Sequence, residues 1–119
     1  MDDESKNILD KLIKTSKVAS LGTSKDNIPY ISMVSYSVSD DSKEYYILIS
    51  QLAEHTQNIL NNPNVSLMIC QPETEKSNPQ TLARVSLNGK AELVERNSDE
   101  FEEIKKNYLT KNPKATLYF

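Results

Sequence analysis

The stretch Glu44–Leu60 reads EYYILISQLAEHTQNIL, and its periodicity changes at Ser50. Glu44–Ser50 is rich in aliphatic and aromatic residues, which predicts a buried β-strand. From there to Asn62 the apolar residues recur at helical spacing, and Pro63 disfavours a helical residue before it. We expect Ser50 to be the N-cap, so that a strand leads directly into a helix N-terminus. The unpaired N–H groups and the helix dipole at such a junction favour an anion.

The rest of the chain alternates strand-like runs with tight turns and two further helices. The expected strands are Lys17–Thr23, Ile31–Val38, Val65–Cys70, Thr81–Leu87 and Lys90–Val94, and the expected helices are 3–16 and a segment that starts at Asn97. The last two strands form either a hairpin through Asn88-Gly89 or one bent strand. Asn97 and Glu100 resemble a capping box. Because short turns join the first three strands, the sequence favours a small antiparallel β-barrel or α+β sheet over a parallel fold.

The strand Ile31–Val38 has two mixed faces. One face carries Ile31, Met33, Ser35 and Ser37, and the other carries Ser32, Val34, Tyr36 and Val38. We expect one of these faces to pack on a core and the other to meet a ligand or a partner.

Length, composition and charge limit the class of protein. The chain has 119 residues and 13.5 kDa, which suits one domain, and its hydrophobic share of 37% predicts a thin core. We therefore expect a homodimer. The net charge of −3 argues against binding nucleic acid. No run approaches the roughly 18 apolar residues of a membrane span, and the acidic N-terminus does not resemble a signal peptide. We expect a cytoplasmic protein that does not bind membranes.

Rare residue types exclude several kinds of site. His55 is the single histidine and Cys70 the single cysteine, which excludes a multi-histidine metal centre, a cysteine-rich zinc site and an internal disulfide. We therefore expect no metal site, and we expect Cys70 to be a small core residue. Gly22 and Gly89 lie too far apart for a glycine-rich phosphate loop. No side chain is a persuasive general acid or base.

The candidate anion-binding residues are Ser50, His55, Thr56 and Arg84. His55 and Thr56 follow Ser50 by about one helical turn, and both can donate hydrogen bonds to a phosphate. The alternative is an ordinary cap at Ser50 and a solvated His55. Arg84 lies in a run otherwise suited to burial, where it either points outward without a role or binds an anion with its guanidinium fork.

Taken in order, four segments resemble the pyridoxamine-phosphate-oxidase-like FMN-binding split barrel. They are Pro29–Tyr36, Leu48–Leu60, Asn62–Leu67 and Ala83–Glu92, and the similarity covers roughly residues 8–118. Within them, the Leu-Ala-x-His-Thr-x-Asn segment at 52–58 resembles the haem-utilisation, haem-oxygenase-like branch. The resemblance implies a single domain over 1–119, mainly β with flanking helices, and a homodimer with two FMN sites at the subunit interface.

The resemblance also implies roles for particular residues. His55 and Thr56 match the arginine-lysine pair that holds the FMN phosphate in the oxidases, with Ser50 and Gln51 beside them. The segment Ser32, Met33, Val34, Ser35 and Tyr36 would run along the flavin ring and ribityl chain, and Arg84 would lie near the phosphate or the ring. The implied function is that of an FMN-dependent oxidoreductase. The alternative is a non-catalytic dimeric module that binds flavin, haem or another anionic cofactor.

Two departures from the family pattern shape these expectations. Ser32 stands where the oxidases have an arginine, which argues against vitamin B6 oxidation. Family members continue beyond the last helix with strands that help to close the barrel, and haem-degrading members have a haem-binding histidine there. This chain ends at Phe119. We therefore expect a split barrel without its closing strands, a weaker FMN site and no haem degradation by these residues alone.

Overall fold

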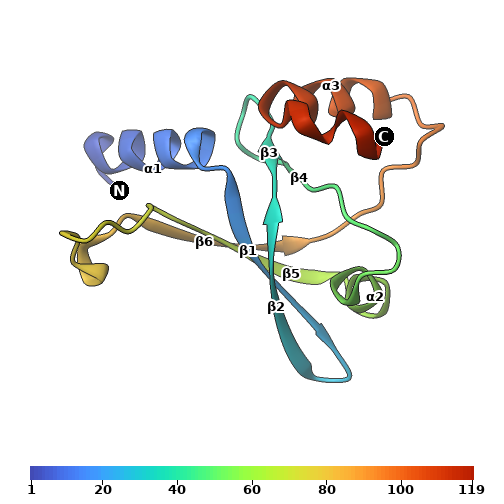
Figure 1. The fold of residues 1–119 in the computed structure, drawn as a ribbon, viewed down its shortest axis with the longest axis horizontal. Coiled ribbons are helices and arrows are strands. Elements are labelled where there is room, and N and C mark those ends of the chain that lie inside the picture. The colour runs from blue at the N-terminus through green and yellow to red at the C-terminus, as the bar shows by residue number, and fades with distance from the viewer.

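The computed structural model describes residues 1–119 as helices flanking an antiparallel sheet (Figure 1). The helices are α1 (Asp3–Thr15), α2 (Glu54–Asn61) and α3 (Phe101–Lys111), with short 3₁₀ segments η1 (Pro79–Thr81) and η2 (Pro113–Tyr118). The strands are β1 (Val18–Lys25), β2 (Ile28–Ser35), β3 (Ser37–Val38), β4 (Tyr45–Tyr46), β5 (Asn64–Cys70) and β6 (Arg84–Lys90). No helix has both the length and the hydropathy needed to cross a membrane.

Four strands form one antiparallel sheet in the order β2-β1-β5-β6, so β2 and β6 are its edges. β1 and β2 pair along their whole length through a turn at Asp26 and Asn27, whose φ angles are 53° and 63°. Positive φ at both central residues is what a type I′ turn requires. β3 and β4 form a separate two-stranded ribbon. In Figure 1 the β1–β2 hairpin projects away from α1 and α3, with α2 beside it.

The strand register gives this sheet two different faces. One row across it is Ser32, Leu21, Leu67 and Leu87, and these residues define what we call the core face. The adjacent row is Met33, Ser20, Met68 and Ser86, and these residues define the outer face. Burial follows this alternation along β1 and β5, where core-face residues are buried and outer-face residues are more exposed.

The core lies between the core face, α1 and the segment after β4. Its buried residues are Leu12, Ile13, Ala19, Leu21, Val34, Tyr36, Leu67 and Ile69. The hydroxyl of Tyr36 is buried and donates a hydrogen bond to the Ile13 carbonyl at 2.5 Å, which ties the residue between β2 and β3 to α1. Only 12 of the 119 residues are fully buried, so the thin core expected from composition is confirmed.

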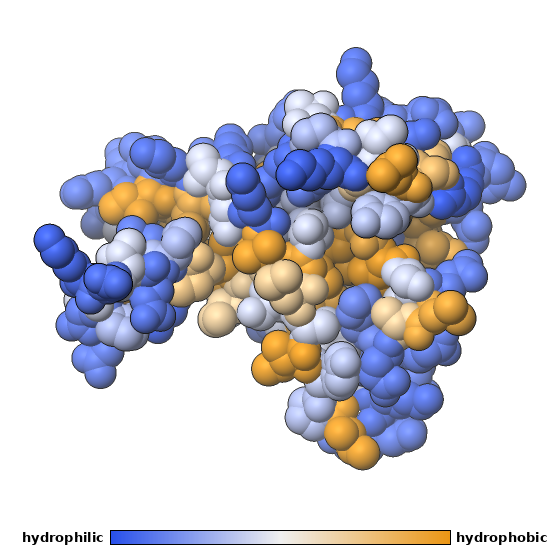
Figure 2. Space-filling model, in the orientation of Figure 1, coloured by the Kyte–Doolittle hydropathy of each residue, from blue (hydrophilic) through white to orange (hydrophobic).

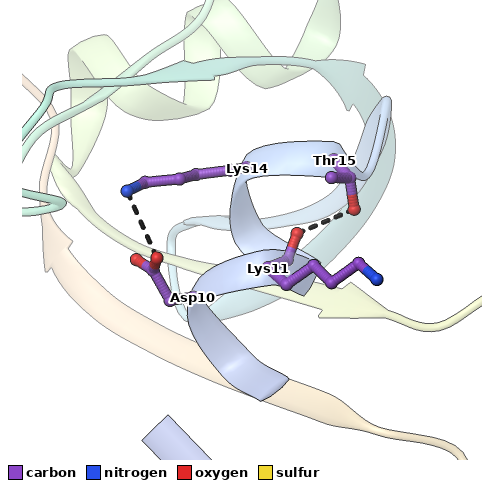
Figure 3. A network of polar contacts seen from close by, with 4 residues as sticks. All are labelled: Asp10, Lys11, Lys14 and Thr15. Carbon is purple, nitrogen blue, oxygen red and sulfur yellow. Dashed lines mark hydrogen bonds and ion pairs between the residues drawn. The ribbon is translucent and has the colours of Figure 1, made fainter. Parts of the chain in front are cut away.

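α1 shows how a helix divides its residues between core and solvent. The Asp2 side chain accepts a hydrogen bond from the Ser5 N–H at 2.6 Å and caps the helix. Leu12 and Ile13 are buried, whereas polar neighbours on the opposite side form contacts within the helix. Figure 3 shows two of these, the Lys14–Asp10 ion pair at 3.2 Å and the Thr15 hydroxyl that donates to the Lys11 carbonyl at 2.7 Å.

α3 is attached to the β2–β3 bend largely through polar side chains. Asn112 Nδ2 donates to the Tyr36 carbonyl and Asn107 Nδ2 to the Val38 carbonyl, both at 3.1 Å. The Lys111 ammonium lies 3.5 Å from the centroid of the Tyr36 ring. α3 is therefore held against the same tyrosine that is bonded to α1.

The strand expected over Glu44–Ser50 is wrong beyond Tyr46. β3 and β4 pair only as Ser37 with Tyr46 and Val38 with Tyr45. Residues 47–50 form no strand pairing, although β2 has β1 as a partner on one side only. Ile47 and Ile49 still pack against the core, which explains why this run has the composition of a buried strand.

Two further local expectations are corrected by the structure. Of the two alternatives left open at Asn88-Gly89, a single strand is present and the hairpin is not, because β6 pairs with β5 without interruption from Arg84 to Lys90. The strand then ends, so the expected run Lys90–Val94 is not extended by sheet pairing. The capping box at Asn97 is also wrong, since α3 begins at Phe101 after Glu100, whose side chain makes no cap bond.

Candidate functional site

The candidate site is centred on a contact between α2 and the sheet edge. His55 Nδ1 lies 3.0 Å from Ser32 Oγ, and both residues are half-buried. Ser32 points from the core face of β2, and His55 comes from the first turn of α2. The structure thus joins two residues that the sequence placed in the same site from distant segments.

The Ser32 contact leaves Nε2 as the imidazole nitrogen available to a ligand. If the Ser32 hydroxyl donates to Nδ1, then Nε2 carries the proton and can donate to an anion. If Nδ1 instead donates to Ser32, then Nε2 offers a lone pair to a metal. The direction of the Ser32–His55 hydrogen bond therefore determines whether Nε2 donates a proton or offers a lone pair.

Ser50 is not the helix cap, which corrects the sequence prediction. α2 begins at Glu54 with Ala53 at the N-cap, and Ala53 makes no side-chain cap bond. Ser50 instead closes the preceding turn, where its Oγ accepts from the Leu52 N–H at 3.1 Å. The correction has a consequence for binding, because the backbone N–H groups of Glu54 and His55 make no hydrogen bond.

Thr56 and Gln51 hold the turn before α2. The Thr56 hydroxyl donates to the Ser50 carbonyl, and Gln57 Nε2 donates to the Gln51 carbonyl at 2.8 Å. In this arrangement the Thr56 hydroxyl proton is already used. The Thr56 side chain therefore stabilises the turn that precedes the helix N-terminus.

The β2 candidates divide between the two faces of the sheet. The side chains of Val34 and Tyr36 are buried in the core, and the hydroxyl of Tyr36 bonds Ile13. Burial raises the pKa of Tyr36, so its phenol stays protonated near neutral pH. Met33 and Ser35 are exposed on the outer face. Only Ser32 presents a polar side chain toward α2.

Arg84 lies far from His55 within one chain. It is exposed at the start of β6, on the outer face and at the opposite edge from β2. Its Nε donates to the Leu82 carbonyl at 3.1 Å, and Nη2 donates to the Pro79 carbonyl. Cys70 is its cross-strand partner and is half-buried rather than a core residue. A single chain does not bring Arg84 to the Ser32–His55 contact.

Sequence reasoning missed Asn58 and Thr23. Asn58 is 2% exposed, Thr23 is 4% exposed, and Asn58 Nδ2 donates to Thr23 Oγ1 at 3.1 Å. Asn58 lies three residues after His55, so the two side chains share one face of α2. A polar residue in register with the candidate ligand was the available signal.

Known proteins are similar to this chain over nearly its whole length. The sequence profile of the family described as pyridoxamine 5'-phosphate oxidase matches residues 6–117. The chain belongs to this family. The fold is accordingly its split-barrel fold, and the resemblance to the haem-utilisation branch is confirmed.

Three relatives illustrate that branch. Heme oxygenase HutZ of Vibrio cholerae is 31% identical over 87 residues, covering 72% of this chain and 47% of HutZ. The chloroplastic heme oxygenase HOZ of Arabidopsis thaliana is 32% identical over 90 residues, covering 76% of this chain and 26% of HOZ. A heme-binding protein from Mycobacterium smegmatis superposes with a TM-score of 0.79 at 28% identity, over 98% of this chain and 45% of that one. The chain therefore spans less than half the length of these relatives.

Proposed function

We propose that the chain binds FMN at the Ser32–His55 contact and serves as the cofactor-binding part of an oxidoreductase. The observation that supports this most directly is the exposed N-terminus of α2. Two unpaired backbone N–H groups lie beside an imidazole whose Nε2 is free. These donors fit a phosphate group. Glu54 in the same turn opposes an anion, so the site is expected to bind weakly.

The proposed cofactor would supply the redox chemistry, while the chain supplies binding and orientation. Ser32, the N-terminus of α2 and His55 would hold the phosphate, and the edge of β2 from Ser32 to Tyr36 would face the rest of the cofactor. The buried side chains of Val34 and Tyr36 restrict their part to main-chain contacts.

We also propose that each site is completed by a second copy of the chain. His55 contacts the core face at one edge of the sheet, whereas Arg84 lies on the outer face at the other edge. Both residues can serve one cofactor only if they come from different subunits. The outer face exposes Ile31 and Met33 to 74% and 73%, which is apolar surface that a partner would cover.

Haem is the second candidate ligand, because HutZ and HOZ are named heme oxygenases and the Mycobacterium smegmatis protein is named heme-binding. The free Nε2 of His55 is compatible with this reading if Nδ1 donates to Ser32. In that case the chain would be a dimeric haem-binding module without flavin.

Titration with FMN, riboflavin and haemin decides between the two candidates. The fluorescence of FMN is expected to fall on binding. Riboflavin lacks the phosphate and is expected to bind at least tenfold more weakly, a difference of about 1.4 kcal/mol in binding free energy. Ser32→Ala is expected to reduce the ratio of FMN affinity to riboflavin affinity. A protein that takes haemin but neither flavin would support the haem-binding module, and one that takes none of the three would contradict both.

A further inference from the structure

α2 contacts the β1–β2 hairpin through one polar stripe. His55 bonds Ser32 at 3.0 Å, Asn58 bonds Thr23 at 3.1 Å, and Asn62 bonds Ser24 at 3.1 Å. His55 and Asn58 are three residues apart and lie on one face of α2, and Asn62 is the extended residue that follows the helix. Each bond joins the helix to a different residue of the hairpin.

Apolar packing alone gives α2 little to fix its position. The helix has eight residues, no side-chain cap, and Asn58 as its one fully buried residue. Leu60 is exposed, and Ile59 is half-buried. A helix this short is marginal without tertiary contacts. Apolar contact is non-directional, whereas hydrogen bonds have strict geometry. The polar stripe therefore determines where the helix lies along the hairpin.

The middle bond is the buried one and reaches both strands. Asn58 Nδ2 donates to Thr23 Oγ1, and the Thr23 hydroxyl in turn donates to the Tyr30 carbonyl at 3.5 Å. Tyr30 precedes Ser32 by two residues on the same face of β2. The Asn58–Thr23 pair thus links α2 through β1 to the part of β2 that carries Ser32.

We propose that Asn58 and Thr23 are positioning residues for the His55 imidazole. A slip of one residue along the helix is about 1.5 Å of rise with a large rotation, which would break a 3.0 Å contact at His55. The buried pair prevents such slips and so keeps Nδ1 on Ser32 and Nε2 free. The use of this imidazole in cofactor binding rests on the proposed function. The positioning itself does not, because the geometry of His55 needs no cofactor.

The single histidine makes the imidazole directly observable. His55 gives the only side-chain imidazole signals in ¹⁵N NMR, which report the state of Nδ1 and Nε2 separately. Ser32→Ala supplies the reference spectrum for an imidazole without its partner. Thr23→Val removes the buried hydroxyl at nearly constant shape, and Thr23→Ser restores it. Thr15→Val removes a hydroxyl on α1, away from the site, as the matched control (Figure 3).

Thr23→Val is expected to move the His55 signals toward those of Ser32→Ala, while Thr23→Ser and Thr15→Val keep the native signals. Native His55 signals in folded Thr23→Val protein would overturn the proposal. If Thr23→Val does not fold, Asn58→Ala is measured in its place with the same expected shift and the same overturning result. The spectra are recorded without any cofactor, so failure of FMN to bind contradicts the proposed function without affecting this outcome.

Discussion

The two faces of the four-stranded sheet come from the same strands but have different fates. On the core face Leu21, Leu67 and Ile69 are almost fully buried beneath α1 and the residues after β4. On the outer face Ile31 and Met33 are about three-quarters exposed. Figure 2 shows hydrophobic side chains reaching the surface over the middle of the sheet and near the end of the projecting hairpin.

This difference shows that the thin core and the exposed apolar side chains have the same cause, because only one face of the sheet is covered. The chain commits α1 and its aliphatic segments to one face and has no element left for the other. The outer face instead mixes Ile31, Met33 and Met68 with small residues such as Ser20 and Ser66. Exposed apolar surface of this kind is typical of a contact with a protein partner, which supports the proposed dimer.

The largest expected effect tests the core face. Leu21→Ala is expected to lower the free energy of unfolding by about 2–5 kcal/mol, because Leu21 is 1% exposed and its loss leaves a cavity. The measurement is urea unfolding followed by circular dichroism at two protein concentrations. The loss of stability in Leu21→Ala should be the same at both protein concentrations. Met33→Ala should lose stability only at the concentration at which the dimer forms. A Leu21→Ala protein as stable as the wild type would contradict the assignment of the core.

The elements that local sequence predicted well are those whose pattern decides their structure. Periodicity located α1 and β5, and the turn residues located the β1–β2 hairpin. The errors arose where the structure of a segment depends on the strand with which it pairs. Residues 47–50 have the composition of a strand but form no strand pairing, and Asn88-Gly89, where the sequence left a hairpin and a single strand open, stays extended because β5 pairs along it. Pairing partners are a tertiary property that no local window contains.

The second prediction concerns the outer face. Met33→Lys is expected to weaken the dimer by roughly 10–100-fold, about 1.4–2.7 kcal/mol, because burial of this side chain would be lost from each subunit. Ile8→Lys, at an exposed apolar position on α1, is the matched control and should leave the dimer intact. Sedimentation at low micromolar concentration measures both. We expect the wild-type interface to exceed about 2,000 Å². A wild-type species of 13.5 kDa would exclude the dimer and with it the shared site.

The third prediction asks whether the outer face contributes to the cofactor site. Arg84→Ala is expected to weaken FMN binding by roughly 1.5–3 kcal/mol, the value of a hydrogen bond to a charged group. Arg96→Ala is the control, since Arg96 is the other arginine and donates instead to the Phe119 carbonyl at 3.1 Å. Fluorescence titration compares the affinities. Equal affinities for wild type and Arg84→Ala would remove Arg84 from the site.

The candidate site was predictable in part for similar reasons. The segment after the third predicted strand pointed to His55, and the resemblance placed Ser32 in the same cofactor site, along the flavin ring and ribityl chain. The structure adds the contact itself. Asn58 belongs to the segment 52–58 quoted for the resemblance but was given no role, and Thr23 was missed, because their bond spans 35 residues and joins two distant segments. Ser50 was misplaced because α2 begins three residues later than the polar pattern suggested.

The smallest expected effect concerns Lys111, whose amine is buried against the core residue Tyr36. Lys111 Nζ is buried without a hydrogen-bond partner over the Tyr36 ring, and this burial lowers its pKa to about 8 from 10.5. Below pH 8 the amine is charged in both states, and the folded state bears the cost of desolvation. Between about pH 8 and 10 the folded protein gives up this proton while the unfolded chain keeps it, so stability rises with pH.

Nearby tyrosines limit the window in which this rise can be read. Burial raises the pKa of Tyr36, Tyr45 and Tyr108, so above about pH 10 the unfolded chain ionises first and stability falls. Urea midpoints between pH 7.5 and 9.5 should therefore rise for the wild type and stay level for Lys111→Met, which keeps the apolar stem over Tyr36 without the charge. Parallel profiles for the two proteins would show that Lys111 keeps its ordinary pKa and that water reaches its amine.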